Sequence, residues 1–195
     1  SSELGGTSLE DLTLEEIEAR KSMLDTDPPA HTRLRALVNK GFTPRVVNTY
    51  EERIRALASG ILAQAFERDS FDWVEDVASE IPMWVFSEIM GLPLDDRRLL
   101  IELGDKLLGN TDPEVVGEEN LLELTSNDPS IRLLPFSSPF ATELIDYGCR
   151  LGAARRTDPR DDITTKLVEA ELDGSRLSEH EFGLFFILLT TAGNE

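Results

Sequence analysis

Cysteine, histidine and basic residues are scarce in this sequence. Its 195 residues include one cysteine, Cys149, and two histidines, and 19 basic residues stand against 38 acidic ones. A single cysteine excludes an internal disulfide framework and is typical of proteins in a reducing compartment, so we expect a cytoplasmic location. The net charge of −19 argues against nucleic acid as a partner, because the two would repel each other.

Long apolar runs and strand-like alternation are also missing. No run reaches the roughly 18–20 apolar residues that a bilayer crossing needs, so no membrane span is predicted. No internal repeat occurs, which excludes a helical-repeat array. The apolar content of 40% is enough for a sizeable core. We therefore expect residues 1–195 to form one mainly α-helical domain.

Apolar residues recur three and four positions apart along most of the chain, which predicts amphipathic helices. The expected ranges are 44–68, 82–90, 94–108, 140–156, 163–172 and a helix from Ser178 onward. Periodicity is lost over 109–139, and connections of this length are often lids. Because the sequence starts without methionine and ends inside an apolar helical pattern, we expect a piece of a longer protein, incomplete at both ends.

Basic residues are concentrated shortly after residue 24. Asp27 suits the N-cap of a helix, and Pro28 and Pro29 suit its first turn, where a missing N–H costs nothing. His31 and Arg35 follow at positions i and i+4, so both leave the same helix face. From residue 31 to residue 50 there is no acidic residue; we define the basic island of this stretch as His31, Arg33, Arg35, Lys40 and Arg45.

Two interpretations fit the basic island. One is a solvated helix face whose arginines pair with carboxylates from elsewhere in the chain. The other is a site that holds an anion, because imidazole and guanidinium groups can donate charge-assisted hydrogen bonds to one carboxylate. Charge alone leaves both interpretations open.

The whole string favours the second interpretation. Asp27-Pro-Pro-Ala-His-Thr-Arg-Leu-Arg35, followed by Phe42-Thr-Pro-Arg45, resembles the C-helix region of bacterial cytochrome P450 monooxygenases. The resemblance implies the cytochrome P450 fold, bound haem b, and His31 and Arg35 as the residues that hold a haem propionate. The run from Val38 to Arg45 is similar to the actinobacterial branch that hydroxylates sterol and steroid side chains.

The far end of the chain carries a second motif. Ser178 and Glu181 have the spacing of a capping box, and the residues after them are apolar on all sides, as in a helix at the centre of a protein. The ending Ala192-Gly-Asn-Glu195 resembles the start of the family's I-helix signature. The resemblance implies that Ala192 and Gly193 border the haem and the oxygen-binding groove, and that Glu195 is a catalytic acid that supplies protons.

The chain also departs from the family pattern. Nothing in it matches the loop Phe-x-x-Gly-x-x-x-Cys that provides the iron ligand, and Cys149 lies on an amphipathic helix. The resemblance therefore covers only helices C to I, without the haem-ligand half. We expect no metal ligand in this segment and no activity from the segment alone.

The resemblance implies a monooxygenase that hydroxylates a lipophilic substrate with O2 and electrons from a ferredoxin-type partner. A sterol or steroid side chain is the first choice of substrate. Arg33, Lys40 and Arg45 are expected to face outward and steer that partner. The expected pocket walls are Met23, Leu24, Leu188, Thr191 and Ala192. The alternative is an all-helical acidic binding or regulatory module that docks a partner through its basic patch.

Overall fold

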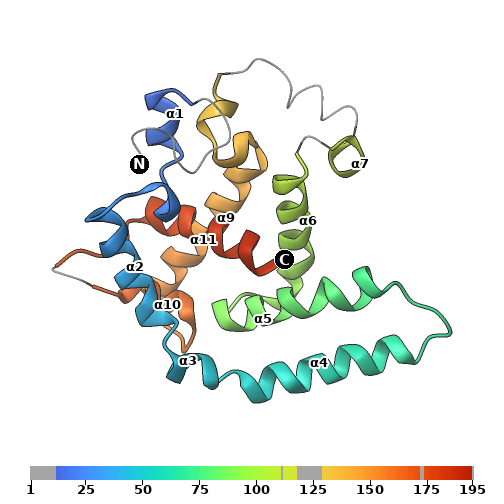
Figure 1. The fold of residues 1–195 in the computed structure, drawn as a ribbon. Coiled ribbons are helices and arrows are strands. Elements are labelled where there is room, and N and C mark those ends of the chain that lie inside the picture. The colour runs from blue at the N-terminus through green and yellow to red at the C-terminus, as the bar shows by residue number, and fades with distance from the viewer. Residues whose placement is uncertain (1–11, 111, 118–128, 172–173, 195) are drawn as a thin grey trace.

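The computed structural model describes residues 12–110, 112–117, 129–171 and 174–194, and most of these residues are helical (Figure 1). The α-helices are α1 (Leu14–Ala19), α2 (Ala30–Gly41), α3 (Pro44–Asn48), α4 (Glu51–Phe66), α5 (Glu80–Met90), α6 (Arg97–Leu108), α7 (Pro113–Val116), α9 (Phe140–Thr157), α10 (Ile163–Glu169) and α11 (Glu179–Asn194). The shorter elements are the 3-10 turns η2 (Met23–Asp25), η4 (Leu94–Asp96), η5 (Ile131–Leu133) and η6 (Pro135–Ser137) and one π-helical turn, η3 (Val74–Ala78). The prediction of a mainly α-helical fold is confirmed.

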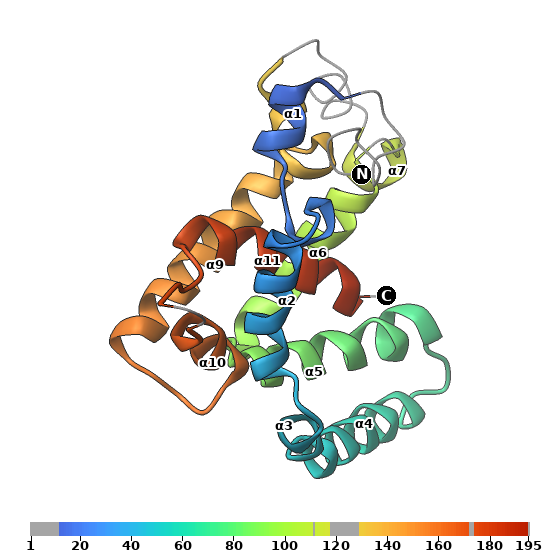
Figure 2. The ribbon, with the colours of Figure 1, turned by 60° about the vertical axis from the view of Figure 1, so that its left-hand side comes forward.

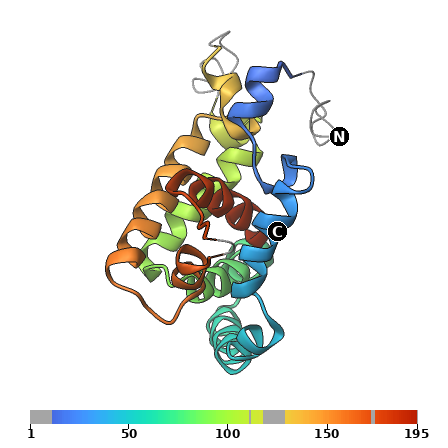
Figure 3. The same cartoon turned by 90° about the vertical axis from the view of Figure 1, so that its left-hand side faces the viewer.

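The core is built where α9 crosses α11 (Figures 1 and 3). Two glycines of α9 make the close approach possible. A Cβ atom on Gly148 would lie 2.7 Å from Phe186, and one on Gly152 would lie 2.8 Å from Phe182. Both phenylalanines are fully buried, at 0% exposed. Any larger residue at positions 148 or 152 would push the helices apart.

The apolar helix α11 lies at the centre of the fold, as its composition predicts. It packs against α9, α5 and α6, and Phe182 to Ile187 are all buried. The capping box is present: the Glu181 amide donates to Ser178 Oγ over 3.1 Å, and the Ser178 amide donates to Glu181 Oε2 over 2.8 Å. These two bonds satisfy amides that a helix start leaves without partners.

The prediction of a single helix over 44–68 is wrong, because a turn separates α3 from α4. Thr43 caps α3 by accepting the Val46 amide, and Pro44 follows it in the first turn, as predicted. At the end of α3, the Thr49 hydroxyl donates to the Val46 carbonyl over 2.6 Å. A side-chain bond of this kind offers the backbone an alternative to the helical ladder.

In the helix expected over 44–68, apolar residues lie three and four positions apart and predict one buried stripe, made of Val47, Tyr50, Ile54, Leu57 and Ile61. This prediction is also largely wrong. Tyr50, just before the helix, is 4% exposed, but Val47 is 45% exposed. The other members of the stripe, Ile54, Leu57 and Ile61, are only half-buried. The reason lies in the arrangement: α4 runs along the lower edge of the molecule, and its neighbours are α5 and η3 (Figure 1).

A buried ion pair ties the ends of α5, α9 and α10 together. Arg155 Nε donates to Asp162 Oδ2 over 2.5 Å, and Arg155 Nη2 donates to the Gly91 carbonyl. Gly91 ends α5 with φ +69°, the left-handed conformation that favours glycine. A Cβ atom there would also lie 2.1 Å from Asp162 Oδ2. Glycine is therefore required at position 91 for two reasons: the backbone is left-handed, and a Cβ atom has no room beside Asp162.

The connection over 109–139 contains only short elements where it is described, namely α7, η5 and η6. Its residues 111 and 118–128 lie outside the described part. Across the ranges that are described, no helix combines the length and apolar character that a bilayer crossing requires.

Candidate functional site

The predicted propionate-binding residues lie in the first half of α2, but the helix begins differently from the prediction. Pro29 occupies the N-cap position in the αR conformation, and it has no side-chain acceptor for a cap. Asp27 is therefore not the N-cap; its backbone carbonyl instead accepts the His31 amide over 3.1 Å. In Figure 2, α2 runs between α3 and the segment that carries α1 and η2.

His31 is half-buried and fixed by the segment that precedes it. Its Nδ1 lies 3.0 Å from the Met23 carbonyl oxygen. A carbonyl can only accept, so Nδ1 carries the hydrogen and Nε2 remains for a ligand. When the imidazole is doubly protonated, Nε2 donates as well.

Arg35, on the same face, is exposed, and no hydrogen bond or ion pair joins it to another described residue. Its guanidinium can donate up to five hydrogen bonds in a fixed fork that matches a carboxylate. His31 and Arg35 leave the same helix face, where an imidazole and a guanidinium group can both contact one carboxylate. The role assigned to the pair stays a prediction, and the donor chemistry agrees with it.

Arg33 does not face outward as predicted. Its Nη2 donates to Glu181 Oε1 of α11 over 2.7 Å, and its Nη1 donates to Ser175 Oγ over 3.1 Å. Its side chain is 32% exposed. The expectation that Arg33 is a free surface charge is corrected, because α2 crosses the start of α11 on this side.

Lys40 and Arg45 are exposed, as predicted. Lys40 donates to the Glu171 carbonyl, and no acidic side chain among the described residues forms an ion pair with it. Arg45 forms no bond with another described residue. Together with Arg35, these two side chains make up the exposed part of the basic island.

The three predicted pocket residues of α11 differ in exposure. Leu188 is half-buried against the core, Thr191 is 8% exposed, and Ala192 is exposed. The Thr191 hydroxyl lies 3.0 Å from the Ile187 carbonyl and 3.1 Å from the Leu188 carbonyl of its own helix. Because the hydroxyl hydrogen is donated within the helix, Thr191 can offer a ligand only its acceptor lone pairs.

Gly193 is not required by packing in the described part of the chain. A Cβ atom on it would lie 3.4 Å from Phe86 Cδ2, which is ordinary contact. Close packing between helices therefore explains this glycine less well than it explains Gly148 or Gly152. Glu195, the predicted catalytic acid, lies outside the described residues.

Met23 and Leu24 lie in η2, before α2. The Met23 side chain packs inward and lines a cavity of only 20 Å³ with Leu34, Val38, Leu177 and Phe185 among others. That volume holds about one water molecule. Leu24 is 55% exposed. Met23 thus faces the start of α11 rather than Leu188, Thr191 and Ala192 near its end.

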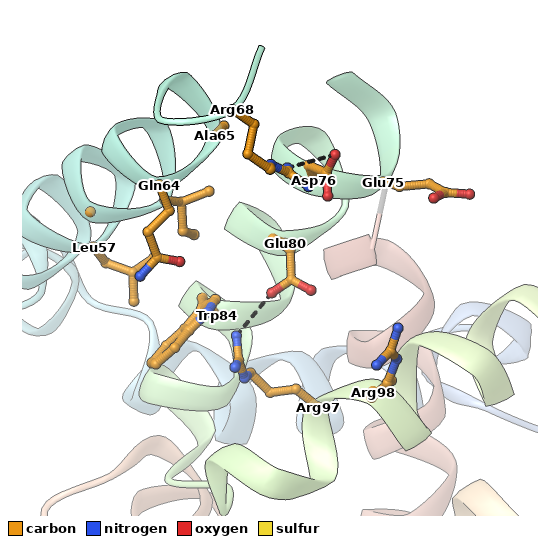
Figure 4. A pocket seen from close by; sticks show the side chains of 12 residues that line it. Leu57, Gln64, Ala65, Arg68, Glu75, Asp76, Glu80, Trp84, Arg97 and Arg98 are labelled. Atoms are coloured by element: carbon orange, nitrogen blue, oxygen red, sulfur yellow. Dashed lines mark hydrogen bonds and ion pairs between the residues drawn. The ribbon is translucent and has the colours of Figure 1, made fainter. Parts of the chain in front are cut away.

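A large groove elsewhere in the described part of the chain contains none of the predicted site residues. It measures 730 Å³ and lies among α4, η3, α5 and α6 (Figure 4). Arg97 stacks 3.7 Å from the Trp84 ring centroid and pairs with Glu80 over 3.1 Å. The charged lining residues are three arginines, Arg68, Arg97 and Arg98, and three acids, Glu75, Asp76 and Glu80. This balance favours neither a cation nor an anion, and we assign the groove no role.

Cys149 is a half-buried thiol. It donates to the Glu179 carbonyl over 3.3 Å, and burial raises the pKa of the thiol, with Asp146 and Glu179 adding to the effect. A thiol in this state is a poor nucleophile and a poor metal ligand. No group of three or more His, Cys, Asp or Glu side chains is arranged to hold a metal ion in the described ranges.

Comparison with known proteins connects this chain with haem enzymes. No family model matches the chain. It is 35% identical over 187 residues to a steroid C26-monooxygenase of Mycolicibacterium smegmatis, a match that covers 95% of this chain and 40% of that protein. It is 33% identical over 175 residues to cytochrome P450 109 of Bacillus spizizenii, covering 90% of this chain and 40% of that protein.

Solved structures agree with these relatives. A cytochrome P450 of Mycobacterium marinum in complex with pseudoionone has a TM-score of 0.73 and 34% identity over 97% of this chain and 44% of its own. A cytochrome P450 of Bacillus megaterium in complex with testosterone has a TM-score of 0.69 and 30% identity over 90% of this chain and 43% of its own. The chain thus spans about two fifths of the proteins it matches.

Proposed function

The chain belongs to the cytochrome P450 family, and on that premise we propose that the whole protein containing it is a haem-dependent monooxygenase. The observation that carries the proposal is 35% identity across 95% of the chain to a monooxygenase of this family. The chain would supply helices C to I of the enzyme. The iron-ligating cysteine would lie outside these residues.

The residues present fit the haem of this family. Haem carries two propionate carboxylates, and α2 offers the Arg35 guanidinium and, in a doubly protonated ring, His31 Nε2, neither of which has a partner among the described residues. Both donate charge-assisted hydrogen bonds to a carboxylate, which are stronger than neutral ones. Haem, when bound with a thiolate ligand, supplies the oxygen-activating chemistry of the reaction. The chain's own part is to hold the cofactor, exclude water and shape the pocket.

Haem retention tests this assignment. In the full-length protein, Arg35→Ala should weaken haem binding by roughly 10- to 150-fold, the loss expected for a charge-assisted hydrogen bond worth about 1.5–3 kcal/mol. Arg45→Ala is the matched control, because Arg45 is also an exposed arginine without a described partner. Haem content after gel filtration would be compared by absorbance. Equal haem loss from both variants would contradict the role of Arg35.

We further infer that the substrate is lipophilic, with a sterol or steroid side chain as the first choice. Two observations support this choice. The end of α11 carries no charged side chain among Leu188, Thr191 and Ala192, and the Thr191 hydroxyl is bonded to its own helix. The relatives include an enzyme named for steroid oxidation and one solved with testosterone. An apolar wall of this kind selects its ligand by shape. Each methylene group of the ligand that it buries contributes about 0.8 kcal/mol of binding free energy.

Substrate titrations of the full-length enzyme test the choice. A lipophile that displaces the water on the iron should shift the haem absorption to the high-spin form. Ala192→Asp should weaken that binding, because it places a charge on the apolar face. Ala153→Asp changes another exposed helical alanine, on α9, and should leave binding unchanged. High-spin shifts with small polar compounds, and none with sterols, would overturn the inference.

The electron donor is inferred to be a small acidic protein of the ferredoxin type. Lys40 and Arg45 support this inference, because they are exposed cations in a chain whose net charge is −19. Exposed charges of this kind raise association rates with an oppositely charged partner. Arg33 is not part of this surface, since Glu181 neutralises it.

A further inference from the structure

A small cavity lies between the end of α5, the second half of α9 and the loop that leads from α9 to α10. It measures 280 Å³, and its charged lining residues are Arg150, Arg155 and Arg160. No acidic side chain lines it within the described part of the chain. Three arginines without an acid are unexpected in a protein that has 38 acidic and 19 basic residues. We call this space the arginine cavity.

Arg155 is the buried member of the three. Its side chain is 5% exposed, and its Nε and Nη2 donate to Asp162 Oδ2 and to the Gly91 carbonyl. Nη1 forms no hydrogen bond with another described residue, yet it is not sealed from solvent. Because Arg155 lines the cavity, Nη1 is the donor that a ligand there can reach. A guanidinium group that the fold already fixes loses little conformational entropy when it binds a ligand.

Arg150 is the member without an acidic partner. It is exposed, and no hydrogen bond or ion pair joins it to another described residue. Its guanidinium carbon lies 5.9 Å from the centroid of the Tyr147 ring, within the range of cation–π attraction. The Tyr147 hydroxyl donates to Asp96 Oδ2 over 2.6 Å, which fixes this ring in the wall of the cavity. Arg150 is therefore held beside the cavity with its charge available to a ligand.

Arg160 comes from the loop between α9 and α10, which is drawn in orange in Figure 2. The backbone of the loop is fixed at this point, because the Arg160 amide donates to Thr165 Oγ1 over 3.0 Å. The guanidinium group pairs with Asp158 over 3.1 Å, and the two side chains are 60% and 70% exposed. Water competes for such an exposed pair, so the pair is weak and an anion in the cavity can share this guanidinium.

We propose that the arginine cavity binds the phosphate group of a small ligand. Three guanidinium groups complement a group that carries two negative charges, and the guanidinium fork matches pairs of phosphate oxygens. Asp162 neutralises Arg155 and Asp158 partly neutralises Arg160, so Arg150 leaves the site with an excess of positive charge.

The size of the cavity limits the ligand. Its 280 Å³ lie just below the roughly 300–1,000 Å³ of sites for drug-sized molecules. The space therefore suits inorganic phosphate or a small phosphomonoester better than a large cofactor. None of the residues predicted to contact haem or substrate lines the cavity, so the proposal does not depend on the function proposed above.

Calorimetric titration of the full-length protein tests the site, with inorganic phosphate and glycerol phosphate as probes at constant ionic strength. Both probes should bind saturably to one site. Arg150→Gln should weaken their binding roughly tenfold, the loss expected for one hydrogen bond to a charged group. Arg160→Gln should weaken it by less, because Asp158 competes for that guanidinium. Haem content should stay at the wild-type level in both variants.

The matched control is Arg156→Gln, which removes a neighbouring arginine of α9. Arg156 does not line the cavity; it donates to the Leu177 carbonyl over 3.0 Å and lies 3.6 Å from Glu179. Its variant should bind both probes as the wild type does. Tighter binding of glycerol phosphate would support a phosphomonoester as the ligand, and equal affinities would support the free anion. The absence of saturable binding would overturn the proposal, as would equal losses from Arg150→Gln and Arg156→Gln.

Discussion

Arg33 on α2 and Glu181 on α11 form an ion pair of 2.7 Å, which joins the two helices that carry the family's motifs. Glu181 uses its other carboxylate oxygen to cap α11 by accepting the Ser178 amide. One carboxylate thus fixes the start of the central helix and its contact with α2. Two members of the basic island therefore have different roles. Arg33 joins α2 to α11, whereas Arg35 has no partner among the described residues.

Neutralising Arg33 should affect stability rather than haem binding. Arg33→Met is expected to lower the free energy of unfolding of the full-length protein by about 0.5–1 kcal/mol, since both partners are about one third exposed and water screens the pair. Urea denaturation measures the loss, and haem content should stay at the wild-type level. A double-mutant cycle with Glu181→Gln, which keeps the cap, isolates the pair. Haem loss equal to that of Arg35→Ala would contradict this division of roles.

The buried pair Arg155–Asp162 should matter far more to stability. Both side chains are 5% exposed, so Arg155→Met leaves the Asp162 carboxylate buried without its charge partner. We expect a loss of about 3–5 kcal/mol in unfolding free energy. Arg156→Met is the matched control: its side chain is 31% exposed and lies 3.6 Å from Glu179, so its loss should stay within about 1 kcal/mol. Equal losses from the two variants would contradict the prediction.

Lys40 and Arg45 should govern the rate of reduction at low salt. Replacing both with glutamine should slow electron delivery from a ferredoxin-type donor at low ionic strength and have little effect at high ionic strength, because salt screens exposed charges. Stopped-flow reduction across a salt series gives the measurement. Arg55→Gln, on α4, serves as a control for loss of charge alone. A rate that is insensitive to both substitution and salt would exclude steering by this surface.

Glu16 should make the stability of the protein sensitive to acid. Its pKa is about 2 in the folded protein against 4.5 without the fold, chiefly because Thr13 donates its amide and hydroxyl to the carboxylate. A lowered folded pKa means that the stabilisation is complete above pH 4.5 and is lost as pH falls towards 2. Over that range the full-length protein should lose more unfolding free energy than its Glu16→Gln variant. Parallel pH profiles from urea denaturation would contradict this assignment.

The sequence predicted the relations between residues that lie close together in the chain. The capping box of Ser178 and Glu181, the end of a helix at residue 90 and the shared face of His31 and Arg35 all depend on residues within one or two helical turns. The helical period shows these relations directly. The apolar character of Phe182 to Ile187 likewise placed α11 at the centre, because such a surface must be covered.

Only the tertiary structure determined which charged side chains form ion pairs. Arg33 was expected to face outward with Lys40 and Arg45, yet the packing of α2 and α11 brings Glu181 to it. The ion pairs Arg132–Glu16 and Arg155–Asp162 form for the same reason. In a chain with 38 acidic residues almost any arginine has candidate partners. Helix packing selects the partner, because an ion pair forms only where the fold brings both side chains within a few ångströms.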